Sequence, residues 1–295
     1  MTATRYRAPF LRTNTDTLSV MADVGIALIP PSVAALWFFG LRAFELLLTA
    51  LVTAFIADRI AAVFRHASQS FDGSALISGW ILALSCPPHT PPVLLAVLCL
   101  LTVWLFREAF GGIGRNLFNP AMASRAVLLT VFPTYAVNAV SGATPLTDHT
   151  VPLSLLTFGR IGGSIGETSV PMILLGGGYL LCRRVISPRI PLLSISAFCA
   201  IIAVSGGDVL RHLLSGSILF ASIYIFTDYT GRPTTPIGEA LFALGCGAIT
   251  ALLRLYGRYP EGVCFAVLLM NLLTLPLEEQ THPRVYGYRR KEKSL

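Results

Sequence analysis

The stretch Asn138-Ala-Val-Ser-Gly-Ala-Thr-Pro-Leu-Thr147 lies in the longest polar interruption of an otherwise apolar sequence. It is rich in small residues, and the hydroxyl group of Thr144 stands between Ala143 and Pro145. Small side chains allow the active site of another protein to close over the backbone, and a proline stops a helix from running through. We therefore expect an accessible loop between two halves of the chain. The same string can also be an ordinary turn, because such short motifs arise by chance.

The composition is that of an integral membrane protein. Of the 295 residues, 54% are hydrophobic and 13% are charged, whereas soluble chains carry about 25% charged residues. The six cysteines form no Cys-x-x-Cys pair and the five histidines form no i, i+4 pair, so zinc, iron–sulfur and helical histidine sites are unsupported. A net charge of +7 alone suggests nucleic acid, but the basic residues are placed between apolar segments, which argues against that partner.

Ten apolar segments are candidates for membrane spans, each of which needs about 20 residues to cross a bilayer. Several are too short to cross alone, notably 73–86, which ends in Cys86-Pro87-Pro88, and 119–133, which begins with Asn119-Pro120. Short spans interrupted by glycine or proline usually indicate broken helices that line a central site. The expected spans are 19–38, 43–58, 73–86, 91–107, 119–133, 170–185, 190–206, 212–228, 238–255 and 261–277.

Five of these spans precede the loop and five follow it, which makes the second half inverted relative to the first. Ser78-Gly79-Trp80-Ile81-Leu82 in the third span resembles Ser215-Gly216-Ser217-Ile218-Leu219 in the eighth, and a proline-rich interruption follows each. Small residues at helix contacts produce similar strings. The placement nevertheless favours an all-α integral membrane fold of about ten helices, arranged as two inverted five-helix repeats with broken helices.

This organisation divides the chain into five parts: an N-terminal arm (1–18), a first membrane repeat (19–133), the loop that contains Thr144 (134–169), a second membrane repeat (170–277) and a basic tail (278–295). No cleavable signal peptide is apparent. If the N-terminus is cytoplasmic, most of the 22 basic residues lie on the cytoplasmic side, as the positive-inside rule requires. Both termini are then cytoplasmic, and the loop is extracytoplasmic, which in a Gram-negative cell means periplasmic.

A second unusual stretch, Gly111-Gly-Ile-Gly-Arg-Asn-Leu-Phe-Asn-Pro-Ala121, precedes the fifth span. Its glycines allow close backbone approach, and a helix that begins near Asn119 points free N–H groups and a positive dipole at whatever lies before it. Arg115 and Asn116 are then placed to hold an anionic or imide-bearing group. The alternative is a tight cytoplasmic turn. No dinucleotide fingerprint, P-loop, Ser-His-Asp set or metal cluster stands out.

Two acidic residues lie at the ends of expected spans, and the basic residue Arg125 lies within one. Asp72 and Asp228 are expected at the same cytoplasmic level, where they either belong to an ion path or are simply solvated. Arg125 lies near the middle of the span 119–133, and an unpaired charge at that depth is costly. We therefore expect Arg125 to pair with a carboxylate or a bound anion.

Ser141-Gly142-Ala143-Thr144, with Asn138 three positions before the serine, resembles the flavin-attachment motif of respiratory flavoproteins. Together with Met21-Ala-Asp-Val-Gly-Ile-Ala-Leu-Ile-Pro30 and the Gly111–Ala121 stretch, it makes nearly the whole chain similar to the RnfD family, a membrane component of the Rnf ion-translocating electron-transport complexes. That family is related to the NqrB component of the sodium-pumping NADH:quinone reductases. Asn138 departs from the pattern, since many members carry Asp there; we do not expect this to abolish attachment.

The resemblance implies a redox subunit of an ion-translocating ferredoxin:NAD oxidoreductase that moves Na⁺ or H⁺. It implies FMN joined covalently to Thr144 as a phosphoester by a flavin transferase, with Ser141, Gly142 and Ala143 completing the attachment motif. It also implies a second, non-covalent flavin (riboflavin or FMN), for which Arg115, Asn116 and Asn119 are the candidates. Thr144 is then an anchor, since the redox chemistry belongs to the cofactor; no amino-acid catalyst is expected.

The expected surroundings follow from the same resemblance: the bacterial inner membrane, with other membrane subunits and flavoprotein or iron–sulfur subunits of the complex as partners. One alternative stays open. Ten spans in an inverted repeat with broken helices also describe secondary transporters and small-solute channels, in which the Thr144 loop is a plain connection and no flavin is bound.

Overall fold

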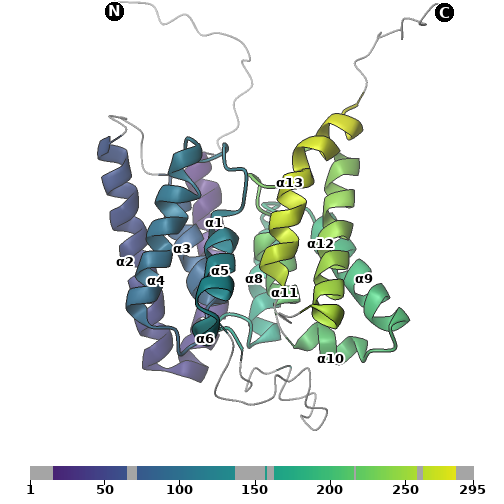
Figure 1. Ribbon diagram of the computed structural model, residues 1–295, viewed down its shortest axis with the longest axis horizontal. Coiled ribbons are helices and arrows are strands. Elements are labelled where there is room, and N and C mark those ends of the chain that lie inside the picture. The colour runs from purple at the N-terminus through teal and green to yellow at the C-terminus, as the bar shows by residue number, and fades with distance from the viewer. Residues whose placement is uncertain are drawn as a thin grey trace, which may run out of the picture.

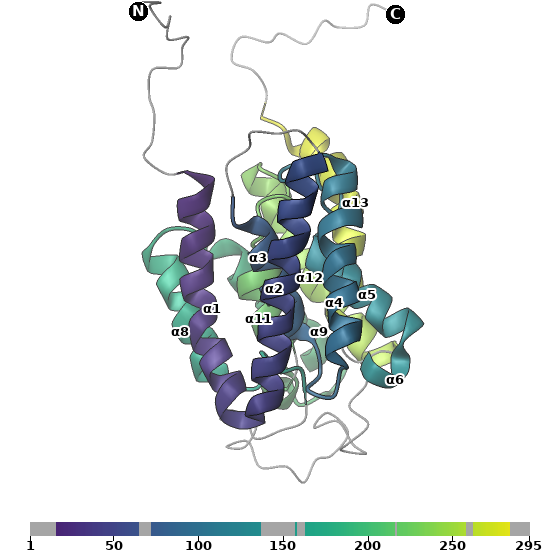
Figure 2. The same ribbon diagram turned by 90° about the vertical axis from the view of Figure 1, so that its left-hand side faces the viewer.

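The computed structural model describes residues 16–64, 72–136, 157, 163–215, 217–257 and 262–283. Within these ranges all regular structure is helical, and no strand occurs. The long helices run side by side in one bundle (Figures 1 and 2). We call the end at which α1 begins and α13 finishes the upper end, as it is drawn in Figure 1. Residues 137–156, which include Thr144 and the rest of the attachment motif, lie outside the described residues.

The first half contains two long helices, two half-length helices and one helix that changes type along its course. Its elements are α1 (Thr17–Phe39), α2 (Leu41–Phe64), α3 (Ser74–Ser85), α4 (Pro92–Leu100), the π-helical turn η1 (Leu101–Leu105), the 3₁₀ turn η2 (Glu108–Phe110), α5 (Pro120–Val131) and α6 (Pro133–Ala136).

The second half also contains two long helices, together with shorter pieces. Its elements are α8 (Val170–Cys182), α9 (Arg189–Val204), α10 (Val209–Leu214), α11 (Ile218–Phe220), the π-helical turn η3 (Ala221–Ile225), α12 (Pro236–Tyr256) and α13 (Val263–Thr281).

Five helical segments of the described chain are long and apolar enough to cross a membrane: Thr17–Phe39, Leu41–Phe64, Pro92–Phe110, Pro236–Tyr256 and Val263–Thr281. Four more, α3, α5, α8 and α9, are apolar but shorter. Many large apolar side chains on the long helices remain exposed, among them Ile29, Phe55 and Leu272. Exposed apolar faces of this extent fit a lipid environment. The prediction of an all-helical, multi-pass membrane protein is confirmed.

Helical structure occurs in every range where a span was expected, but the eighth span (212–228) is wrong as a single helix. The chain stops being helical after Leu214 and resumes at Ile218. Arg254 of α12 stabilises the end of α10 at this break, because its Nη1 atom donates hydrogen bonds to the carbonyl groups of His212 and Ser215. Carbonyls at a helix end need such donors from outside the helix.

The starts of two helices follow from local sequence. The Asn119 side chain accepts a hydrogen bond from the N–H of Met122 and Pro120 follows it, so α5 begins there. Thr235 caps α12 in the same way, ahead of Pro236. A side-chain acceptor at the cap followed by proline is a strong start signal, because the first N–H groups of a helix lack partners inside it.

The two halves meet at a tightly packed junction of α1, α8 and η3. Pro31 of α1 has no N–H group, so the carbonyl of Ala27, four residues earlier, lacks its usual intrahelical donor. The hydroxyl of Tyr224 supplies one, 2.9 Å from the Ala27 oxygen. Gly176 of α8 makes room, since a Cβ atom there would lie 2.1 Å from both that carbonyl oxygen and the Tyr224 hydroxyl. The halves also meet where α5 packs on α13.

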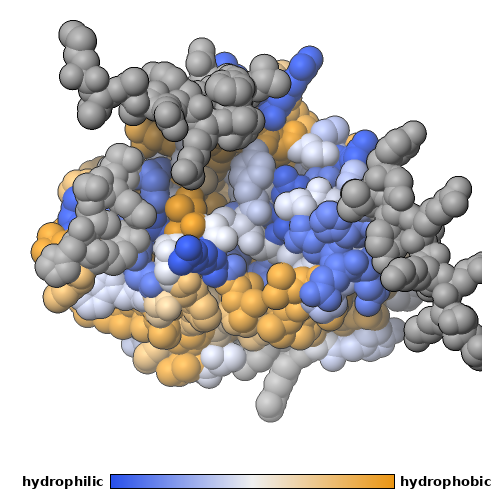
Figure 3. Space-filling view, turned by 90° about the horizontal axis from the view of Figure 1, so that it is seen from above, coloured by the Kyte–Doolittle hydropathy of each residue, from blue (hydrophilic) through white to orange (hydrophobic). Residues whose placement is uncertain are grey.

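Hydrophilic side chains gather toward the middle of the upper face, and apolar side chains flank them (Figure 3). Large apolar side chains, among them Leu84, Leu128 and Phe198, are buried in the bundle core. A polar site among the described residues is therefore expected near the upper end.

Candidate functional site

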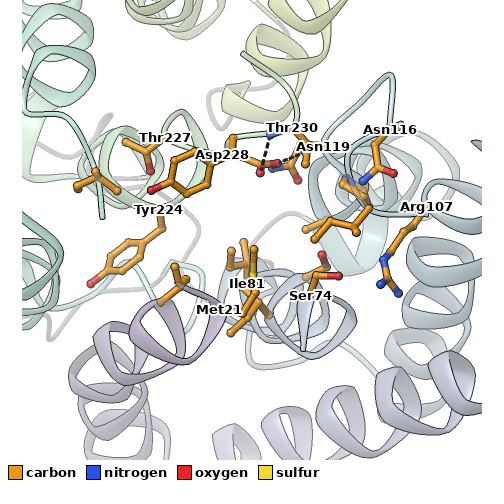
Figure 4. A pocket seen from close by; sticks show the side chains of 18 of the residues that line it. Met21, Ser74, Ile81, Arg107, Asn116, Asn119, Tyr224, Thr227, Asp228 and Thr230 are labelled. Atoms are coloured by element: carbon orange, nitrogen blue, oxygen red, sulfur yellow. Dashed lines mark hydrogen bonds between the residues drawn. The ribbon is translucent and has the colours of Figure 1, made fainter. Parts of the chain in front are cut away.

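A cleft opens between the two halves near the upper end of the bundle (Figure 4). It has a narrow deep cavity of about 80 Å³ and a wider outer cavity of about 870 Å³. The two cavities adjoin, since six residues line both: Met21, Ile113, Asn116, Asp228, Tyr229 and Thr230. A cleft formed by both halves, and wide at its outer part, is where a small-molecule ligand is expected.

Two half-length helices begin at the deep cavity. Ser74, the first residue of α3, and Pro120 and Ala121, the first residues of α5, all line it. The first N–H groups of a helix lack intrahelical partners and carry a partial positive charge. The cleft therefore favours a ligand that presents hydrogen-bond acceptors or negative charge.

A hydrogen-bonded network of Asn119, Asp228 and Asn271 joins three elements at the cleft. The Asn119 Nδ2 atom donates to Asp228 Oδ2 at 2.9 Å, and the Asn119 backbone N–H donates to Asn271 Oδ1 at 3.0 Å. Asn271, from α13, also donates to the carbonyl of Gly231 at 2.7 Å. The network fixes the start of α5 against the loop 226–235 and α13.

Asp228 is the carboxylate that lines the deep cavity (Figure 4). It lies in the loop after η3 and accepts hydrogen bonds from the N–H and hydroxyl groups of Thr230, at 3.3 and 3.1 Å. Burial raises the pKa of the Asp228 carboxyl group, while the hydrogen bonds from Thr230 and Asn119 and the charge of Arg232 oppose that rise.

Arg107 also lines the deep cavity, but its charge is used within the protein. Its Nη1 atom lies 2.8 Å from Asp58 of α2 and its Nη2 atom lies 2.8 Å from Asp72. Asp72 in turn accepts hydrogen bonds from the N–H and hydroxyl groups of Ser74, at 2.9 and 2.8 Å. Arg107 therefore positions the first turn of α3 at the cleft, and Asp72, predicted on an ion path or solvated, is ion-paired.

The structure separates the three residues predicted to hold a second ligand. Asn119 is buried, and both ends of its amide group are bonded within the protein. Asn116 lines both cavities, and its buried Oδ1 atom has no hydrogen-bond partner in the described part of the chain. Arg115 is exposed and lines the outer cavity. The fit is therefore best for Asn116 as a ligand-contacting side chain, with Asn119 in a positioning role.

Other predicted residues fall elsewhere. Ser141, Gly142, Ala143 and Thr144 lie outside the described residues. Arg125 is buried in α5, and its Nη2 atom donates to the Ser164 hydroxyl at 3.0 Å. Among the residues that the structure describes, no group of three His, Cys, Asp or Glu side chains suits a metal ion.

Sequence reasoning missed Asn271 and Tyr224. Asn271 is a single amide inside the apolar helix α13, and a buried amide in an apolar helix needs a partner, which is a signal that was available. Tyr224 gave no such signal, because its partner is a carbonyl that Pro31 leaves free about 200 residues earlier in the chain.

Comparison with known proteins shows which family and which individual proteins this chain resembles. The sequence profile described as the "NQR2, RnfD, RnfE family" matches residues 4–287. The D subunit of a proton-translocating ferredoxin:NAD(+) oxidoreductase complex from Clostridium ljungdahlii is 33% identical over 317 aligned positions, covering 96% of each chain. A Na(+)-translocating counterpart from Acetobacterium woodii is 34% identical, covering 95% of this chain and 94% of its own. The D subunit of an ion-translocating oxidoreductase complex from Halorhodospira halophila is 35% identical with the same coverage.

Proposed function

We propose that this chain is the D subunit of an ion-translocating ferredoxin:NAD⁺ oxidoreductase complex. The chain belongs to the NQR2, RnfD, RnfE family, which is the premise of this proposal. The observation that carries this proposal is the match of more than nine-tenths of the chain, at 33–34% identity, to two subunits of that name. Other subunits of the complex are then its partners. These two relatives differ in the ion they translocate, so the similarity is compatible with Na⁺ or H⁺.

The protein carries FMN as a phosphoester of Thr144 and passes electrons through the membrane. Support comes from the sequence, where Ser141-Gly142-Ala143-Thr144 resembles a flavin-attachment motif. The flavin supplies the redox chemistry, and the protein holds and orients it. A flavin transferase makes the attachment, and a covalent bond keeps the cofactor in place on a side of the membrane without an assured flavin pool.

A second, non-covalent flavin occupies the cleft between the halves. The outer cavity of about 870 Å³ is large enough for a cofactor. The unpartnered Oδ1 atom of Asn116 accepts a hydrogen bond from the imide N–H of the ring, and the N–H group of Ala121, in the first turn of α5, is available as a donor to a ring carbonyl group. Asp228 and Asn271 hold Asn119, and through it the α5 start, in position.

The fold consists of two inverted five-helix repeats. The packing of corresponding spans supports this proposal: α1 packs on α8, the first expected span of each half, and α5 packs on α13, the fifth of each. The second and fourth spans also pack together in both halves, as α2 with α4 and α9 with α12. Both termini face the cytoplasm and the Thr144 loop faces the periplasm across the bacterial inner membrane, as the distribution of basic residues favours.

The experiment is complementation of cells that lack this protein. Membranes that contain the wild-type chain should reduce NAD⁺ with reduced ferredoxin, and membranes with Thr144→Val should lose most of that activity. Thr147→Val, three residues along the same stretch, is the control and should keep it. Equal activity in membranes with and without the chain would contradict the proposal.

A channel or transporter without flavin is the second candidate, and the broken helices favour it. Half-helices α3 and α5 start at a shared cleft, as they do in many transporters. Purified protein that contains no flavin, covalent or extractable, and that conducts a solute in vesicles would establish this candidate.

A further inference from the structure

The loop between α8 and α9 presents a basic surface. Arg183, Arg184 and Arg189 are all exposed there. Arg183 is ion-paired with Asp23 of α1, at 3.2 Å. The guanidinium groups of Arg184 and Arg189 have no hydrogen-bond or ion-pair partner within the described residues. Two cations without a partner in the described part of the chain therefore lie five positions apart, Arg184 in the loop and Arg189 at the first position of α9.

The backbone at Arg184 is held in a conformation that arginine disfavours. Arg184 has a φ of +56° and is the non-glycine residue with positive φ in the described part of the chain. Here α8 is closed by hydrogen bonds from the N–H of Val185 to the Leu180 carbonyl and from the N–H of Arg184 to the Leu181 carbonyl, both 3.0 Å long. This helix ending usually has glycine at the position of Arg184. An arginine in a backbone conformation that favours glycine suggests that its guanidinium group has a function at this position.

The two cations adjoin an apolar helix surface. Leu174, Leu175 and Leu181 of α8 are 52%, 59% and 40% exposed, and Leu192 of α9 is 67% exposed. Because Arg183 contacts Asp23, near the beginning of α1, the loop lies toward the upper end of the bundle (Figures 1 and 2). Apolar faces that end at unpaired arginines offer places for acyl chains and for a negatively charged headgroup.

We propose that Arg184 and Arg189 bind the phosphate group of an anionic phospholipid whose acyl chains lie along the exposed faces of α8 and α9. Arginine suits this role because its planar guanidinium group donates two parallel hydrogen bonds to phosphate oxygens. Neither Arg184 nor Arg189 lines the cleft, and the proposal does not depend on any flavin.

The test is the thermal unfolding midpoint of the full-length chain in a neutral detergent, with added phosphatidylglycerol, phosphatidylcholine or inorganic phosphate. Phosphatidylglycerol at saturation should raise the midpoint by about 5 °C, and the other two additives should have little effect. The double variant Arg184→Gln/Arg189→Gln should lose more than half of that increment. Arg42→Gln, an exposed arginine at the start of α2, is the control and should retain it.

Arg184→Gly separates backbone strain from charge. It should raise the lipid-free midpoint by about 2 °C, because glycine adopts this backbone conformation without strain, and it should also reduce the increment from phosphatidylglycerol. A full increment in the double variant would overturn the proposal, as would an equal effect of phosphatidylcholine. An equal effect of inorganic phosphate would overturn the assignment to lipid.

Discussion

The two halves of this protein meet at two contacts, of which one is tightly packed and the other borders a cavity. At the junction of α1, α8 and η3, Gly176, Ala27 and Tyr224 pack so closely that no side chain larger than glycine fits at position 176. At the cleft, Asn119, Asp228 and Asn271 join the halves by hydrogen bonds beside a cavity. The first contact is filled by protein and the second leaves room for a ligand. We infer that packing holds the halves together and that the polar contact shapes a binding site.

The largest expected effect is at the packed junction. In Gly176→Val the new Cβ atom would lie 2.1 Å from the Ala27 oxygen and the Tyr224 hydroxyl. We expect a loss of at least about 3 kcal/mol in stability, because backbone and side chains must both move. Thermal unfolding in detergent measures it. Gly178→Ala is the control in the same helix, since its Cβ would meet nothing within 4 Å; equal losses in both variants would contradict the packing argument.

The polar contact should be less sensitive to one substitution. Asn271→Leu leaves the buried Asn119 N–H group without its partner, while the Gly231 carbonyl keeps the hydrogen bond from the Thr274 hydroxyl. An unpaired buried donor costs about 1–3 kcal/mol. It should also reduce the non-covalent flavin released from the purified protein by acid. Ser196→Ala is the control, because the exposed Ser196 hydroxyl bonds only to its own helix. If stability and flavin content are both unchanged in Asn271→Leu, the network does not position the start of α5 at the cleft.

Tyr224→Phe removes one hydrogen bond at the packed junction and should cost about 1 kcal/mol. The reason is specific: the hydroxyl serves a carbonyl that Pro31 leaves without a donor. In a Pro31→Ala background the helix supplies its own N–H, so Tyr224→Phe should cost less there, and a double-mutant cycle measures the difference. The same cost in both backgrounds would rule out the compensation.

The smallest effect on stability is expected at Asn116, which has no hydrogen-bond partner for its Oδ1 atom among the described residues. Asn116→Ala should change the unfolding free energy by less than about 0.5 kcal/mol and yet lower the content of acid-released flavin severalfold. Quantitative flavin extraction checks this. A destabilised variant with full flavin content would assign Asn116 to the fold and not to the ligand.

The sequence predicted the helical membrane class because long apolar runs and a low charged content follow directly from the bilayer as solvent. The start of α5 at Asn119-Pro120 was also predictable, since a cap residue and proline act locally. The partner of the carbonyls at the end of α10 was not predictable, because Arg254 lies about 40 residues later in the chain. The sequence also could not distinguish Asn119 from Arg115 and Asn116 as a ligand-binding residue. The hydrogen bonds that give Asn119 a positioning role join it to residues more than 100 positions later in the chain.

The central claim is that this chain is a flavoprotein with one covalent flavin at Thr144, in the loop between the halves. The most direct measurement is the fluorescence, under ultraviolet light, of the protein band after denaturing gel electrophoresis. The chain should be produced together with a flavin transferase that is shown to be active on a second substrate. We predict a fluorescent wild-type band, an equally bright Thr147→Val band and a dark Thr144→Val band. A dark wild-type band would contradict the account and leave the channel without flavin as the better explanation.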